Sequence, residues 1–160
     1  MVKRSTILMV VLALCLLALV PAASAKVGGT DRPAKADLAG YVYWEPYAAC
    51  AAHNEPGWAT RTIATGTMSH LGEVQASWTH CWDEATDRYF EGSLMLTAAN
   101  GDMLWGWYAD VTDGDWPIHI TGGTGRFEDA TGTINLMWYG LNWDTDPIGW
   151  WAHLEGAISY

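Results

Sequence analysis

Basic residues are scarce in this 160-residue chain, and lysine is absent after Lys35. Eight lysines and arginines stand against 18 aspartates and glutamates, so the formal net charge at pH 7 is −10. Beyond Lys35 the basic residues other than histidine are Arg61, Arg88 and Arg126. An acidic surface repels phosphate backbones and anionic lipid headgroups. The composition therefore argues against nucleic acid as a partner and against electrostatic docking on a membrane.

Nucleotide-binding motifs are also missing, although residues 120–132 (ITGGTGRFEDATG) form a glycine-dense loop after an apolar run. A dinucleotide fingerprint needs a third glycine where Glu128 stands, and a P-loop needs a lysine that this loop lacks. Glycines that accept positive φ let a chain reverse between strands. We therefore expect no nucleotide or other cofactor here, and a turn in which Gly125 has positive φ.

Only one long apolar run occurs, from Ile7 to Val20, and it is shorter than the roughly 20 residues of a membrane-spanning helix. Lys3 and Arg4 precede it, and the small-residue site Ala23-Ser24-Ala25 follows. This order predicts a secretory signal peptide over residues 1–25, with an uncleaved anchor as the alternative. The protein is then secreted, to the periplasm or the medium, and residues 26–160 are enough for one domain.

Cysteine is rare, and only Cys50 and Cys81 follow the predicted signal peptide. Export places them where thiols oxidise, so a single disulfide is expected. A metal site built from Cys50, His53, His80 and Cys81 is the alternative. Neighbouring residues on a strand point to opposite faces, which disfavours His80 and Cys81 as joint ligands, so no metal is expected.

Helical periodicity is almost absent. Residues 26–39 (KVGGTDRPAKADLA) show no period and suggest a flexible leader, whereas apolar and polar residues alternate from Gly40 onward. This alternation predicts a domain over residues 40–160 with about eight half-buried strands. They are expected near 40–45, 61–70, 73–82, 88–98, 102–111, 116–121, 132–140 and 148–158. The dipeptide Asn100-Gly101 is a strong hairpin signal.

Short turns between consecutive strands predict an all-β fold. A single small eight-stranded antiparallel up-and-down barrel is favoured, because closure removes the exposed edges. Such a barrel is either calycin-like or of the type described next.

Residues 122–127 (GGTGRF), followed by Ala130-Thr131-Gly132, resemble the GGTGxFxxAxG segment of allene-oxide-cyclase-like barrels. That group includes dirigent proteins and secreted bacterial proteins. Residues 67–72 and 97–102 are similar to two further segments of the bacterial group. The resemblance implies an eight-stranded barrel with an apolar interior, and the trimers of the plant members imply a homo-oligomer. The plant proteins guide reactive apolar intermediates, but their functional polar residues have no counterpart here, so no catalytic residue is assigned.

Tryptophan is abundant, with 11 residues in the chain. Aromatic side chains on one face of alternating strands either fill a narrow barrel or line a pocket, because eight strands leave room for either. The candidate ligand-binding residues on these faces are Trp78, His80, Phe90, Trp105, Trp107, Trp138 and Trp150.

The sequence thus predicts a secreted barrel that binds a small apolar or aromatic molecule, with catalysis less expected than binding. Three alternatives stay open. A carbohydrate-binding module would present exposed tryptophans, and Trp44, Trp58, Trp116, Trp143 and Trp151 lie nearer turns or on opposite faces. A cyclase or isomerase would need a histidine or carboxylate inside the barrel. An outer-membrane barrel would turn its apolar face outward to lipid.

Overall fold

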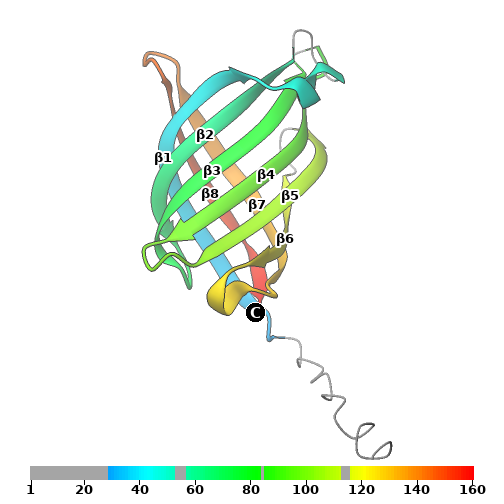
Figure 1. The fold of residues 1–160 in the computed structure, drawn as a ribbon. Helices are drawn as coiled ribbons and strands as arrows, with labels where there is room; N and C mark the ends of the chain where they lie inside the picture. The colour runs from blue at the N-terminus through cyan, green and yellow to red at the C-terminus, as the bar shows by residue number, and fades with distance from the viewer. Residues whose placement is uncertain (1–28, 53–56, 84, 113–115) are drawn as a thin grey trace, which may run out of the picture.

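Eight antiparallel strands close into one barrel in the computed structural model, which describes residues 29–52, 57–83, 85–112 and 116–160 (Figure 1). Each strand pairs with its neighbours along the chain, and β8 pairs with β1 to close the sheet. The strands are β1 (Arg32–Pro46), β2 (Trp58–Met68), β3 (Gly72–Asp83), β4 (Arg88–Ala98), β5 (Met103–Thr112), β6 (Pro117–Gly123), β7 (Thr131–Asn142) and β8 (Ile148–Ser159). The predicted up-and-down barrel is confirmed.

Two short 3₁₀ helices interrupt the connections, η1 (Ala48–Ala52) and η2 (Gly125–Phe127). Among the described residues, no helix is long and apolar enough to cross a membrane.

Glycines with positive φ make the tight reversals. Gly101 has φ 88° in the turn between β4 and β5, where its N–H donates to the Ala98 carbonyl at 2.9 Å. Gly125 has φ 58° at the start of η2, as the sequence predicted. A Cβ on Gly125 would lie 2.3 Å from the Asp102 carboxylate, so the loop packs closely against the neighbouring hairpin. The glycine-dense loop is therefore a turn in the barrel wall.

The first strand begins earlier than the sequence predicted, which corrects the expected leader over residues 26–39. The chain pairs with β8 from Arg32↔Ile158 to Ala39↔Trp151. Ala34, Ala36 and Leu38 point inward and are buried. Two of these three inward side chains are alanines, so the alternation carried little hydrophobic signal. The predicted signal peptide, residues 1–25, lies outside the described residues.

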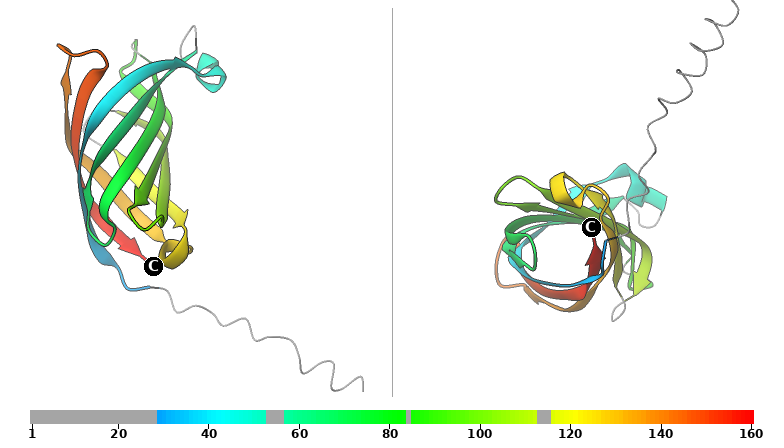
Figure 2. Two further views of the ribbon diagram at one scale, coloured as in Figure 1. Left: turned by 60° about the vertical axis from the view of Figure 1, so that its left-hand side comes forward. Right: turned by 90° about the horizontal axis from the view of Figure 1, so that it is seen from below.

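The β2–β3 and β4–β5 turns lie at the same end of the barrel (Figures 1 and 2). Buried aliphatic side chains pack toward this end. Phe127 of η2 is completely buried there, and its ring centroid lies 4.7 Å from that of Tyr160. The fully buried aliphatic residues are Leu94, Leu96, Leu104, Ile118, Ile134, Leu154 and Ile158. This end is therefore a closed core.

A disulfide joins η1 to β3 through Cys50 and Cys81, with an S–S distance of 2.05 Å. The predicted disulfide is confirmed, and the alternative metal site is wrong because both sulfurs are used. His53, the other nitrogen ligand considered with His80, lies outside the described residues. The bonded cysteines and Ala59 form a small cluster separate from the main core, and Phe90 packs against it.

Candidate functional site

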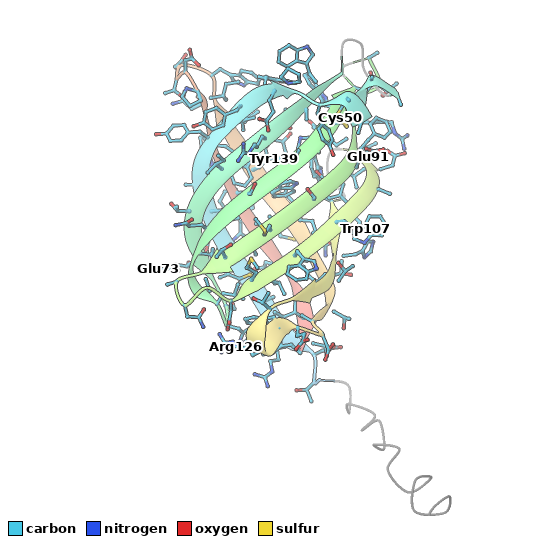
Figure 3. All side chains as sticks on the ribbon, in the orientation of Figure 1. Cys50, Glu73, Glu91, Trp107, Arg126 and Tyr139 are labelled. Atoms are coloured by element: carbon cyan, nitrogen blue, oxygen red, sulfur yellow. A yellow bond between two sulfur atoms is a disulfide. The ribbon has the colours of Figure 1, made fainter. Side chains whose placement is uncertain are left out.

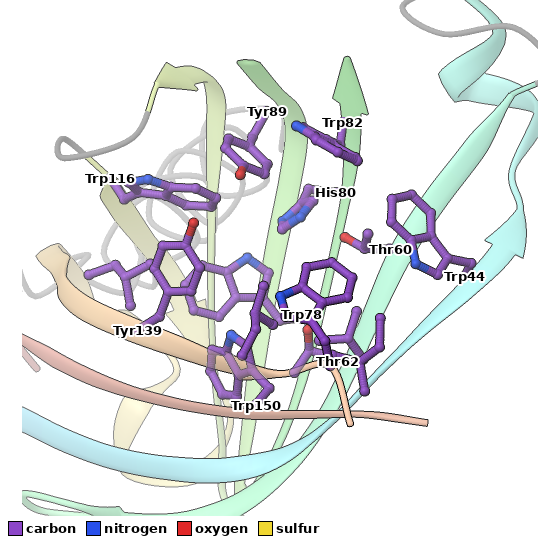
Figure 4. Close-up of a pocket in the computed structure, with 15 residues that line it drawn as sticks. Trp44, Thr60, Thr62, Trp78, His80, Trp82, Tyr89, Trp116, Tyr139 and Trp150 are labelled. Carbon is purple, nitrogen blue, oxygen red and sulfur yellow. The ribbon is translucent and has the colours of Figure 1, made fainter. Parts of the chain in front are cut away.

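The opposite end of the barrel is hollow. A cavity of about 240 Å³ lies among the ends of the strands far from η2 (Figure 4). Its walls come from every strand except β5 and β6, together with Trp116 directly before β6 and Trp143 directly after β7. The lining residues are Val42, Trp44, Thr60, Thr62, Trp78, His80, Trp82, Tyr89, Trp116, Leu136, Tyr139, Leu141, Trp143, Ile148 and Trp150.

Side-chain size along the inward-facing positions explains why this end differs from the core. On β3 the inward positions change from Val74 and Ala76 at the closed end to Trp78 and His80 at the hollow end. On β2 the threonines Thr60 and Thr62 face these large side chains, in register with His80 and Trp78 respectively. Rigid aromatic rings beside short threonines cannot fill the barrel as branched aliphatic residues do, and a cavity remains.

Trp78 is the centre of the aromatic wall. It is only 3% exposed, and its ring packs edge-to-face on Trp116, Trp150 and Tyr108, with centroids 6.0, 5.8 and 6.2 Å away. Tyr89 lies against Trp116 at 4.3 Å. Figure 4 shows Trp78, Tyr89, Trp116 and Trp150 around the cavity. Interlocked rings of this kind hold one another in place, so the wall is preorganised.

A hydrogen-bonded chain lies behind this wall. The indole N–H of Trp78 donates to the hydroxyl oxygen of Tyr108 at 3.0 Å, and that hydroxyl lies 2.7 Å from Nδ1 of His80. Burial lowers the pKa of His80 to about 3, from an ordinary value of 6.5. Burial also raises the pKa of Tyr108. Both groups are therefore neutral at physiological pH.

Tyr108 reaches this position because β4 leaves space for its ring. Gly92 is the register partner of Tyr108, and a Cβ on Gly92 would lie 1.9 Å from Cζ of the tyrosine. The preceding residue, Glu91, has φ 51°, in the left-handed region. The register of β3 with β4 shifts at the facing positions between Thr79 and Cys81. The ring thus lies flat on a glycine beside a bulge, a known way to pack an aromatic side chain on a sheet.

The polar chemistry of the cavity is neutral. None of its lining residues carries a charged side chain at neutral pH; the polar groups are hydroxyls, indole N–H groups and the imidazole of His80. Two buried polar atoms in the wall, Thr60 Oγ1 and Trp116 Nε1, have no hydrogen-bond partner. Native proteins rarely leave such atoms unpaired, because desolvation without a bond costs about 1 to 3 kcal/mol.

The structure brings three of the seven predicted ligand-binding residues to this cavity: Trp78, His80 and Trp150. The expectation that Trp105 and Trp107 share the inward face is wrong, because they are 37% and 48% exposed while Leu104 and Tyr108 are buried. Figure 3 shows Trp107 on the outside of the barrel. Large apolar residues occupy both faces of β5, so alternation alone did not reveal which face is inward.

Trp138 and Phe90 are also placed away from the cavity. Trp138 is 52% exposed because the pairing of β7 with β8 shifts between Leu136 and Trp138, which puts Tyr139 inward in its place. Phe90 faces the disulfide cluster, and Tyr89 lines the cavity instead. Both errors occur at register shifts, which reverse the inward and outward positions for the rest of a strand.

Sequence reasoning missed several lining residues, among them Trp116, Tyr89 and Tyr139. Trp116 directly precedes β6 and was grouped with the tryptophans that lie nearer turns or on opposite faces, although it is 4% exposed. The available signal was the two-residue spacing: Trp116 lies two residues before Ile118 and four before Ile120, and both isoleucines are buried.

Comparisons of the chain with protein-family models, with curated proteins and with solved structures found no match.

Proposed function

We propose that this protein is a secreted barrel that binds one small apolar or aromatic molecule in the cavity of its hollow end. The observation that carries the proposal is the contrast between the two ends of the interior. Aliphatic residues and Phe127 are packed and fully buried toward one end, whereas rigid aromatic rings around about 240 Å³ of space line the other. A concave, mostly apolar site with a few polar groups is the usual form of a small-molecule site.

The disulfide supports the secreted part of the proposal, because such bonds persist in oxidising compartments. The outer face of the barrel is mixed. Lys35, Asp37 and Arg61 point outward on β1 and β2, and large apolar side chains such as Trp105, Trp107 and Trp138 are exposed on other strands.

Binding is favoured over cyclase or isomerase chemistry by the state of the interior groups. His80 lies inside the barrel, but with a pKa of about 3 it is a weak base at neutral pH. Among the lining residues no carboxylate stands beside it to act as its partner.

Titration with the uncharged fluorescent probe N-phenyl-1-naphthylamine tests the proposal. We expect saturable binding of one probe per chain. Trp150→Ala should weaken it on the order of tenfold, because a wall of the cavity is lost. Trp107→Ala is the matched control: the same change on the outer face should leave probe affinity unaltered. Non-saturable binding, or an equal effect of both substitutions, would contradict the proposed site.

A further inference from the structure

The direction of the hydrogen bonds at Tyr108 determines the tautomer of His80. The Tyr108 hydroxyl has one proton, and its oxygen already accepts the indole N–H of Trp78. An indole nitrogen only donates, so among the described residues Nδ1 of His80, at 2.7 Å, is the acceptor within reach of that proton. Donation from Tyr108 to Nδ1 satisfies the buried hydroxyl completely. The reverse direction would leave its proton without an acceptor in a buried position.

A neutral imidazole that accepts at Nδ1 carries its proton on Nε2. The three side chains then form a relay with all donors pointing one way, from Trp78 through Tyr108 to His80. Hydrogen bonds aligned in this manner polarise one another, which strengthens the last donor. His80 lines the cavity, and no described residue accepts a hydrogen bond from Nε2. The relay therefore ends in an unused N–H donor.

The remaining chemistry of the wall disfavours a charged ligand. An anion would find donors but no basic side chain among the lining residues, and the whole chain has a formal net charge of −10. A cation would find aromatic faces, which attract it, but also the positive end of the imidazole N–H dipole. Burial already keeps His80 itself uncharged in these surroundings.

We propose that the bound molecule is a neutral aromatic compound with a hydrogen-bond acceptor, such as an aryl ketone or quinone, whose oxygen accepts from Nε2–H of His80. This inference rests on the proposed binding function and names the ligand chemistry of the same cavity.

Four naphthalene derivatives of similar size test the proposal by calorimetry on the mature protein. They are 2-acetonaphthone, its hydrocarbon counterpart 2-isopropenylnaphthalene, the anion 2-naphthoate and the cation (2-naphthylmethyl)trimethylammonium. We expect the ketone to bind more tightly than either ion. His80→Phe should weaken the ketone on the order of tenfold relative to the hydrocarbon, because the buried oxygen loses its donor. Trp150→Phe changes the same wall and removes no donor or acceptor of the relay, so it should affect ketone and hydrocarbon equally.

The ¹⁵N chemical shifts of the His80 ring give a second measurement that needs no variant. We expect a protonated Nε2 and an unprotonated Nδ1 at pH 7, and a shift of the Nε2–H proton when the ketone binds. An Nδ1–H tautomer, tightest binding of the cation or anion, or equal losses of ketone and hydrocarbon in His80→Phe would overturn the acceptor proposal while leaving the binding function standing. Failure of all four compounds to bind would overturn both.

Discussion

Replacing Gly92 with alanine should destabilise the barrel by roughly 2 to 4 kcal/mol, because the Tyr108 ring occupies the place of the new methyl group. The added Cβ would lie 1.9 Å from Cζ and 2.2 Å from both Cε atoms of a ring that is 1% exposed. Displacing the ring breaks its two hydrogen bonds, at about 1 kcal/mol each, and overpacks the core at about 1 to 3 kcal/mol. The lower backbone entropy of unfolded alanine returns about 0.5 to 1 kcal/mol.

Urea unfolding followed by far-UV circular dichroism measures this loss. Gly149→Ala is the matched control, since Gly149 also lies in a strand and its added Cβ would come no closer than 3.2 Å to another atom. In a Tyr108→Leu background the effect of Gly92→Ala should largely disappear, because the two residues are then no longer coupled. A loss no greater than that of Gly149→Ala, or one of equal size in both backgrounds, would refute the reasoning.

Three further predictions concern the disulfide and the pH dependence of stability. Removing the disulfide with Cys50→Ser and Cys81→Ser should lower the unfolding free energy by about 3 to 4 kcal/mol on the chain-entropy model, because 31 residues separate the cysteines. In the native protein, the intact mass after alkylation should show no free thiol. The pKa of His80 is lowered from 6.5 to about 3, so its contribution to stability is complete above pH 6.5 and is lost as the pH falls toward 3. In His80→Phe the decline in stability from pH 6.5 to 4 should be shallower by up to about 1.4 kcal/mol per pH unit, and equal slopes would show that the imidazole is not buried neutral. In His153→Gln the change should instead occur above pH 6.5, as a smaller loss of stability with rising pH. Hydrogen bonds to Asp37 and Glu155 raise the pKa of His153, so its stabilising contribution is complete below pH 6.5 and is lost as the pH rises.

The sequence predicted the positions of the strands better than it predicted which of their side chains face the barrel interior. Seven of the eight predicted strands overlap the observed ones closely, because their alternation and turn residues are local signals. The first strand was predicted too short, since Ala34 and Ala36 bury little apolar surface and Pro33 suggested a loop.

The inward-facing and outward-facing side chains were predicted correctly where only one face of a strand is apolar. On β3, Trp78 and His80 alternate with Ser77 and Thr79, and the prediction that Trp78 and His80 face inward is confirmed. On β5 the outward Trp105 and Trp107 are larger than the inward Leu104, so hydrophobicity pointed the wrong way. On β7 a register shift reversed the pattern at Trp138.

The sequence alone determined the all-β class, the turn glycines and the pairing of the two cysteines. The first two depend on neighbouring residues, and the third follows because only two cysteines follow the predicted signal peptide. Tertiary structure decided the site. Trp78 and Tyr108 are 30 residues apart, and His80 and Tyr108 are 28 apart. Their hydrogen bonds form because bulges and Gly92 place Tyr108 beneath the wall of a closed barrel. No local pattern carries that information, since contacts across a barrel depend on the registers of all the strands together.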